Sequence, residues 1–398
     1  MATKRDGSRT RMLIQNGTVL TDSTRRRMDI RITHGIISEM APSLKAEEGD
    51  FVVDGTGLYV APGFVDIHTH GGANVDVNHA EENDFERISL FFASRGVTGW
   101  QCSVLTDTEE QTLRCIDSAS RYAASDRPGA RLLGIHLEGP FLSRDYRGSM
   151  PEQLLRSQFD LDLVRRYQKA ASGLIRYITV SPEIEGVPEG IPALHDLGIH
   201  VSIGHSGADY DTAWRAIRAG AEAATHTMNA MLPLNRHRPA ITGAVLESDM
   251  YCEAICDGIH LHPGTVRLIL KTKGLDRVIA ITDSIMAAGL PDGQYQLGVN
   301  DVTVTNGDAM VTGTDIRAGS TLTMDRALQN LVRFTGEEPE VVLPLLTKNP
   351  AGLLGDNRIG NIAVGMRGDL VLLTEELIVA RTIVFGETQY KKHDTQSG

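Results

Sequence analysis

The sequence feature that most constrains the fold is a series of short, apolar, β-rich segments that end in histidine or an acidic residue. The residues at these ends are His68, His70, Glu138, His205, His226 and Asp283. Helical stretches such as 81–94, 108–124, 210–219 and 263–272 separate most of the segments. Because the functional side chains of a (β/α)₈ barrel lie at the carboxyl ends of its strands, this order predicts such a barrel.

Eight segments fit the strands of the barrel. They are residues 63–70, 97–106, 132–140, 175–181, 200–205, 223–228, 251–257 and 278–283. Strands that alternate with helices favour a parallel sheet, and eight of them favour its closure. The sequence therefore predicts an α/β protein of the (β/α)₈ TIM-barrel type.

Both ends of the chain are rich in short β segments and show no helical period. Such strands need partners, so we expect residues 1–60 and 357–398 to form one small β-sandwich domain. Residues 61–356 then form the catalytic barrel domain. A hairpin insertion is expected near 294–316, with Asn306-Gly307 as its turn.

Two further helices, residues 321–335 and 339–354, are expected to lead from this hairpin back to the small domain. Cys252 and Cys256 lie in a segment that we expect to be buried. Four cysteines in 398 residues are too few for a disulfide framework. The sequence shows neither a signal peptide nor an apolar run of about 20 residues, the length that spans a membrane, so a cytoplasmic setting is expected.

The net charge of −12 argues against nonspecific binding to nucleic acid, because the surfaces that bind nucleic acid are basic. An anionic small substrate stays open, since a local site can be positive on an acidic protein. No membrane or nucleic-acid partner is therefore expected.

Five of the strand-end residues have the chemistry of metal ligands. His68 and His70 are two residues apart on a strand, so both side chains point to the same side. Packing could explain that pair alone, but it does not explain Glu138, His205 and His226 at three further strand ends. Imidazoles and a carboxylate suit zinc and similar divalent ions. We therefore predict a metal centre at this end of the barrel.

Asp283 ends the eighth predicted strand. Two roles fit an aspartate there: the N-cap of a helix, or a general base that takes a proton from water and returns it to the leaving group. We favour the general base, because a metal lowers the pKa of water to about 7 and so makes hydroxide available at neutral pH.

Eight motifs stand out along the chain. They are APGFVDIHTHG at 61–71, HLEGPF at 136–141, GHS at 204–206, THTMNAM at 225–231, DGIH at 257–260, TD at 282–283, AAGLPDG at 287–293 and AGSTLTM at 318–324. Together they resemble the amidohydrolase superfamily and, within it, the N-acetylglucosamine-6-phosphate deacetylase family with its N-acetylgalactosamine-6-phosphate relatives. The resemblance covers nearly the whole chain, and the set of motifs is highly specific for the family. It implies a barrel of the amidohydrolase kind.

The resemblance also implies a role for each candidate residue. Glu138, His205 and His226 would bind the principal divalent metal, and Asp283 would be the general acid and base. His68 and His70 match members that can hold a second metal, whereas other members carry amides there. The implied substrate contacts are Asn229 and Ala230 at the sugar phosphate, His260 at the substrate, and Ala318 and Gly319 over the sugar.

Two segments depart from the family pattern. Gly148-Ser149-Met150 stands where the family usually has Gly-Ala-His or Gly-Thr-His, whose histidine helps to bind the substrate and polarise its amide carbonyl. A thioether donates no hydrogen bond, so a second metal could substitute as the electrophile. In the segment 236–240 the family's phosphate-binding arginine aligns with His237. Arg236 or Arg238 could replace it, because guanidinium binds phosphate in a fork.

The sequence thus predicts a metal-dependent amidohydrolase. It would hydrolyse the acetamido group of an N-acetylhexosamine 6-phosphate, with N-acetylglucosamine 6-phosphate as the leading candidate, to an amino sugar phosphate and acetate. One or two divalent ions per subunit are expected, zinc first, with iron, manganese, cobalt or nickel as alternatives. The resemblance also implies a homodimer.

Alternatives to this function stay open. The substrate could be N-acetylgalactosamine 6-phosphate or a non-phosphorylated N-acyl sugar. In another class, the protein could be an inactive sugar-phosphate binding paralogue, which the change at Met150 motivates.

Overall fold

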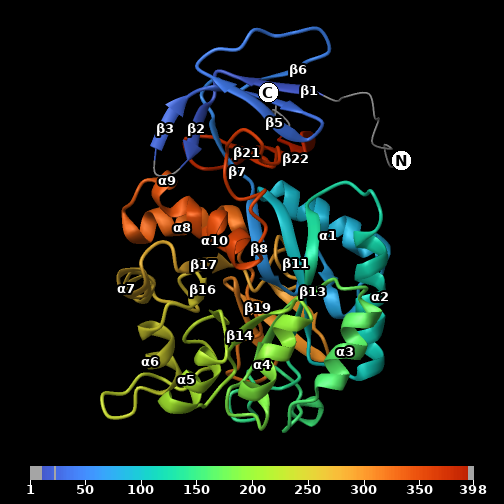
Figure 1. Cartoon of the computed structure of the whole chain (residues 1–398), viewed down its shortest axis with the longest axis vertical. Helices are drawn as coiled ribbons and strands as arrows, with labels where there is room; N and C mark the ends of the chain where they lie inside the picture. Colours follow the sequence, from blue (N-terminus) through green and yellow to red (C-terminus); the bar gives the residue numbers. More distant parts are fainter. Residues whose placement is uncertain (1–10, 22–23, 393–398) are drawn as a thin grey trace.

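The barrel is the larger part of the fold (Figure 1). The computed structural model describes residues 11–21 and 24–392. Eight parallel strands follow one another in chain order around the sheet: β8 (Phe64–Thr69), β11 (Val97–Leu105), β12 (Arg131–Glu138), β13 (Ile175–Val180), β14 (His200–Ile203), β15 (Ala223–Ala224), β16 (Tyr251–Ile255) and β17 (Val278–Ile281). The N–H of Asp283 donates to the carbonyl of His68 at 2.9 Å, which joins the end of the last strand to the first. The predicted (β/α)₈ fold class is confirmed.

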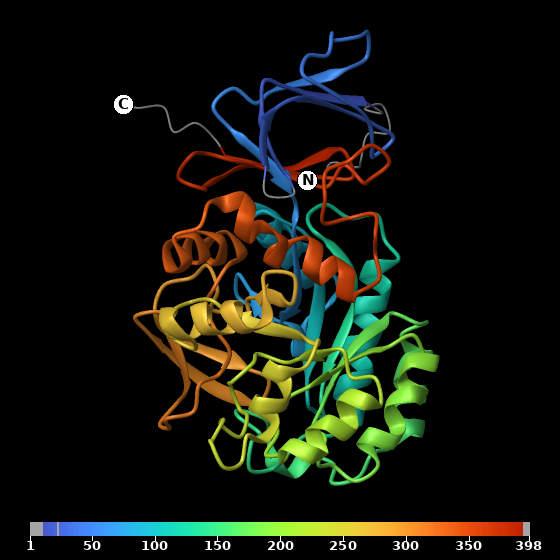
Figure 2. The same ribbon diagram turned by 60° about the vertical axis from the view of Figure 1, so that its left-hand side comes forward.

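Helices cover the outside of the barrel (Figure 2). They are α1 (Glu82–Ser94), α2 (Glu109–Ala123), α3 (Leu161–Ala170), α4 (Val187–Asp196), α5 (Tyr210–Arg218), α6 (Ala240–Glu247), α7 (Pro263–Lys273) and α8 (Met324–Thr335). Side chains at their starts satisfy free N–H groups: Thr108, Asp160 and Asp209 each cap a helix by accepting from the residue three positions on. The buried faces of these helices pack against the apolar outer side of the strands.

The prediction of one helix over 339–354 is wrong. The segment consists of α9 (Pro339–Val342), a 3₁₀ helix (Leu343–Leu346) and α10 (Lys348–Leu353). Pro344 and Pro350 lie within it, and each lacks the N–H that a continuous α-helix would use. Two shorter 3₁₀ helices lie at Val77–His79 and Glu152–Leu154, and two short strands, β9 (Gly71–Gly72) and β10 (Val75–Asp76), follow β8.

Both ends of the chain build a pair of sheets beside the barrel (Figure 2). One sheet has the order β5-β4-β1-β6 and the other β23-β22-β21-β7-β2-β3. Their strands are β1 (Arg11–Gln15), β2 (Thr18–Thr21), β3 (Thr24–Arg27), β4 (Asp29–Thr33), β5 (Ile36–Ala41), β6 (Phe51–Asp54), β7 (Tyr59–Pro62), β21 (Leu370–Leu373), β22 (Val379–Val384) and β23 (Glu387–Lys391). A separate apolar core, which includes Ile14, Ile32, Leu370 and Ile383, joins residues from the two ends.

The expected insertion is a three-stranded antiparallel sheet rather than a two-stranded hairpin. It consists of β18 (Gly293–Leu297), β19 (Asn300–Thr305) and β20 (Asp308–Val311), and Asn306-Gly307 turns the chain between the last two. The Asn300 side chain donates to the carbonyl of Ser149 at 2.8 Å, so this sheet holds the loop that follows β12. In the described ranges, no helix is both long and apolar enough to cross a membrane.

Candidate metal centre and active site

The chain turns sharply directly after three barrel strands. His205, His226 and Asp283 follow β14, β15 and β17, and their φ angles are +46°, +29° and +48°. Residues other than glycine rarely adopt such left-handed angles, and those that do gather at functional sites. Each turn brings its side chain to the carboxyl end of the barrel.

One group of ligand atoms comes from Glu138, His205 and His226, all buried. Oε1 of Glu138 lies 3.1 Å from Nε2 of His205 and 3.2 Å from Nε2 of His226. The two Nε2 atoms are 3.0 Å apart. We call these residues the first trio.

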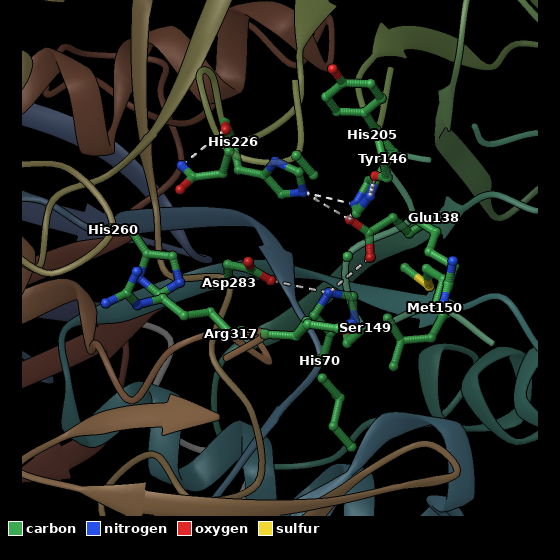
Figure 3. Close-up of a pocket in the computed structure, with 18 of the residues that line it drawn as sticks. His70, Glu138, Tyr146, Ser149, Met150, His205, His226, His260, Asp283 and Arg317 are labelled. Carbon is green, nitrogen blue, oxygen red and sulfur yellow. Dashed lines mark hydrogen bonds and ion pairs between the residues drawn. The ribbon is translucent and has the colours of Figure 1, made fainter. Parts of the chain in front are cut away.

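A second group of ligand atoms comes from His68, His70 and Asp283, again all buried. Nε2 of His70 lies 3.2 Å from Nε2 of His68 and 3.1 Å from Oδ1 of Asp283. We call these residues the second trio. Glu138 lies between the trios, because its Oε2 is 3.2 Å from Nε2 of His70 (Figure 3).

These donor sets fit divalent metal ions. Tetrahedral bonds of about 2.0–2.2 Å place neighbouring ligand atoms roughly 3.3–3.6 Å apart, and the atoms of each trio stand close to that spacing. Two imidazole nitrogens that face each other need a cation or a proton between their lone pairs. Imidazole and carboxylate are ligands for zinc, and also for iron, nickel and manganese.

The outer nitrogens of the histidines fix the direction of the inner ones. Nδ1 of His70 lies 3.0 Å from the carbonyl of Ser103, and Nδ1 of His205 lies 2.9 Å from that of Tyr146. Nδ1 of His68 lies 3.0 Å from Oε2 of Glu253. With Nδ1 as the donor in each pair, the lone pair of Nε2 faces the centre, the arrangement that metal-binding histidines need. Nδ1 of His226 has no partner among the described residues.

Glu253 supports both trios from the buried middle of β16. Besides His68 it accepts the backbone N–H of His226 at 3.0 Å and the hydroxyl of Tyr177 at 2.7 Å. A single carboxylate thus holds one histidine of each trio. Glu253 was not among the predicted site residues, because a lone acid inside an apolar strand gives no pattern.

The buried charges shift several pKa values. Burial disfavours the imidazolium of His70, but hydrogen bonds to Asp283 and Glu138 outweigh it and raise the pKa of His70 to about 9. Burial likewise disfavours the carboxylate of Glu138, yet His68 and the hydrogen bonds from His205 and His226 hold its pKa well below the usual range. The buried carboxylates of Glu138 and Asp283 therefore need a nearby positive charge to stabilise them, and a divalent cation supplies it.

A cavity of about 420 Å³ opens beside the two trios. The predicted site residues that line it are His70, Glu138, Ser149, Met150, His205, His226, Asn229, Ala230, His260, Asp283 and Gly319. In the view of Figure 3, Met150 and Ser149 lie on the side of Glu138, and His260 lies on the opposite side. Ala318 is fully buried behind Gly319 rather than in the lining.

His237 and Arg238 do not line this cavity. Both are exposed on the turn before α6, where Nε of Arg236 donates to Nε2 of His237 at 2.9 Å. Their contact with the substrate stays a prediction, since the cavity of a single chain does not include them.

Arg317 lines the cavity and was not among the predicted residues. Its Nε and Nη2 atoms each lie 3.0 Å from an oxygen of Asp308 on β20, a fork that orients the guanidinium. His260 is oriented in the same way, since its Nδ1 lies 2.6 Å from Oδ2 of Asp257. The available signal for Arg317 was its position next to the Ala318-Gly319 loop.

Comparison with known proteins agrees with this geometry. The pattern of the Amidohydrolase family matches residues 59–389. An N-acetylglucosamine-6-phosphate deacetylase from Lysinibacillus sphaericus is 32% identical, over 96% of this chain and 99% of that protein. An N-acetylgalactosamine-6-phosphate deacetylase from Escherichia coli O157:H7 is 30% identical, over 90% of this chain and 93% of that protein.

A solved structure shows the same fold. It is a mutant N-acetyl-D-glucosamine-6-phosphate deacetylase from Mycobacterium smegmatis in complex with N-acetyl-D-glucosamine-6-phosphate, with a TM-score of 0.89 and 32% identity over 96% of this chain and all of that one. The chain therefore belongs to the amidohydrolase family and, within it, to the N-acetylglucosamine-6-phosphate deacetylase family.

Proposed function

We propose that this enzyme hydrolyses the acetamido group of N-acetylglucosamine 6-phosphate to glucosamine 6-phosphate and acetate. The observation that carries the proposal is the placement of Asp283. Its carboxylate is part of the second trio, 3.1 Å from Nε2 of His70, and also lines the cavity, so it can reach both a metal ion and a substrate. Full-length relatives with this activity, and a neighbour that holds this sugar phosphate, support the choice of substrate.

The first trio would hold the principal divalent ion, and the second trio would line the place for another. When bound, such an ion supplies Lewis acidity that favours the deprotonation of water and polarises an amide carbonyl. Zinc is the first candidate for both positions, from the donor types alone.

Asp283 would act as the general base and then as the general acid. Its Oδ1 would accept the proton of the attacking water, and the same proton would pass to the amide nitrogen as the C–N bond breaks. Its pKa favours this order: burial raises it, but His68 and His70 outweigh burial and lower it, so the carboxylate is ionised at neutral pH.

The far side of the cavity would receive the sugar and its phosphate. His260 and Arg317 offer donors there, and both are fixed by carboxylates. The N–H of Ala230 is a further donor, because it has no acceptor among the described residues. Aligned N–H groups and guanidinium are the usual phosphate ligands.

We also propose that the enzyme is a homodimer and cytoplasmic. A partner subunit could bring exposed basic residues of the turn that carries His237 and Arg238 to the phosphate, which would explain why they lie outside the cavity of their own chain. The mass of the particle in solution tests the dimer.

Acetate release tests the function. The metal-loaded enzyme is assayed on N-acetylglucosamine and N-acetylgalactosamine, each with and without the 6-phosphate. The expected result is the highest kcat/KM for N-acetylglucosamine 6-phosphate. Equal kcat/KM with and without phosphate would move the assignment to a general N-acyl sugar deacetylase, and no acetate from any substrate would favour an inactive sugar-phosphate binder.

A further inference from the structure

A second polar cavity lies at the opposite, amino-terminal end of the barrel. It has a volume of about 480 Å³ and lies between the starts of β11, β12 and β13 and the loop after α10. Arg131, the first residue of β12, lines it, whereas Glu138, the last residue of the same strand, lies in the metal centre. We call it the basal cavity.

The basal cavity carries an excess of positive charge. Four arginines line it, Arg131, Arg176, Arg358 and Arg367, against one carboxylate, that of Asp356. Asp356 is already shared, because it lies 3.4 Å from Nε of Arg358 and 3.2 Å from Nη1 of Arg367. The nearby Asp369 is buried and accepts the backbone N–H of Phe385 at 2.6 Å.

Two of the guanidinium groups make no direct hydrogen bond or salt bridge. Among the described residues the side chains of Arg131 and Arg176 have no such partner, and the charge of Arg131 acts only at longer range, on the buried carboxyl of Asp369. The guanidinium of Arg367, by contrast, is held in place, since its side chain is only 10% exposed and its Nη1 lies 3.2 Å from Oδ2 of Asp356. The cluster thus combines fixed and free donors.

Gln101 adds an independent sign of a ligand. It lines the basal cavity and is 0% exposed, yet neither its amide nitrogen nor its amide oxygen has a partner among the described residues. Most buried polar side chains are hydrogen-bonded, so an unpaired amide at a cavity indicates a missing partner there.

Local irregularities of the sheet shape this cavity. The pairing of β11 with β12 shifts between Trp100 and Gln101, and bulges of this kind redirect side chains. Gly134 leaves room for Arg176, because a Cβ at residue 134 would lie 2.6 Å from Cγ of that arginine.

We propose that the basal cavity binds a compact phosphate-bearing anion, either inorganic phosphate or a phosphate monoester. Guanidinium forks bind phosphate oxygens with two parallel hydrogen bonds, and the amide of Gln101 can donate a further one. The cavity is large enough to hold a group esterified to the phosphate as well. This proposal does not depend on the reaction at the other end of the barrel.

Equilibrium dialysis of the full-length, metal-loaded protein against radiolabelled inorganic phosphate tests the proposal. The variant Arg131→Gln/Arg176→Gln should lose one bound phosphate per chain, or weaken it at least tenfold. The matched control Arg114→Gln/Arg121→Gln removes the same charge from exposed positions of α2 and should bind as the unchanged protein does. Gln101→Leu keeps every charge and should still weaken binding several-fold.

Competition identifies the natural form of the ligand. If glucose 6-phosphate displaces the phosphate that depends on Arg131 and Arg176 at lower concentration than unlabelled phosphate does, the site takes a monoester; if not, it takes the inorganic ion. Phosphate binding that is the same in the unchanged protein, the double variant and Gln101→Leu would overturn the proposal, and so would the absence of any bound phosphate. The cavity would then hold water only.

Discussion

The two ends of the barrel are built from the same strands but carry opposite chemistry. At the carboxyl ends, four histidines and two carboxylates come together, three of them placed by left-handed turns, and the carboxylates attract cations. At the amino ends, bulges and a loop bring four arginines around an unpaired amide, a setting that attracts anions. The strands between them therefore separate a catalytic end from an end that can bind without reacting.

The largest expected effect belongs to Asp283→Asn at the catalytic end. An amide can neither accept nor return the proton, so kcat should fall by about 10²–10⁴. The ion that the first trio would hold does not depend on Asp283, so at least one metal ion per chain, measured by atomic emission, should remain. Turnover that survives this change would remove Asp283 from the mechanism.

The next largest loss of turnover is expected from substitutions of the two histidines of the second trio. If a second ion replaces the hydrogen bond that Met150 cannot donate, His68→Gln/His70→Asn should lower kcat about 10²–10³-fold, the usual cost of one transition-state donor. Adding Met150→His to this variant should recover part of the loss. A fall of less than tenfold would mean that the pair is a spectator.

The next effect concerns Glu253, whose carboxylate orients one histidine of each trio. Glu253→Gln weakens the hold on both His68 and His226, so metal affinity should fall about 10–100-fold, as expected when such a supporting carboxylate is lost. Competition with a chelator measures it. Glu222→Gln is the control, since Glu222 contacts His200 at the start of β14, away from both trios, and should leave affinity unchanged.

A substitution at Gly319 tests whether the wall of the cavity tolerates a side chain at this position. The φ of this glycine is +58°, and a Cβ there would lie 2.7 Å from the carbonyl oxygen of Asp283. Gly319→Ala should therefore cost about 1–3 kcal/mol of unfolding free energy, measured in urea, and should also reduce turnover. Gly313→Ala has a similar φ of +78° but open space around it. It should cost less and leave turnover unchanged.

The smallest expected effect on turnover comes from the basal end. Arg131→Gln/Arg176→Gln should change kcat/KM by less than about twofold, because surface changes away from a site are usually nearly neutral. A larger fall, with metal content intact, would show that the two ends are coupled through the strands rather than separate.

The sequence predicted the catalytic end better than the basal end, for a physical reason. Ligand types such as His205 and His226 recur at strand ends, and the topology of a barrel then brings them together. Arg317 and Arg176 carry no such pattern, because their directions depend on a salt bridge with Asp308 and on the space above Gly134. Glu253 was hidden inside an apolar strand for the same reason.

Segment boundaries were also less predictable than the order of the elements. The strand expected over 223–228 is only Ala223–Ala224, because the chain leaves the sheet early to turn at His226. The division of the chain at residues 60 and 357 remains a prediction, although the sheets of both ends share an apolar core.

The position of β7 links the metal centre to the order of protein synthesis. β7 lies between β2 and β21, and it runs directly into β8, which carries His68. A chain emerging from the ribosome makes β21 only after all the residues of both trios, and domains generally fold as units. β7, which leads into the strand of His68, therefore gains its second neighbour in the sheet only near the end of translation.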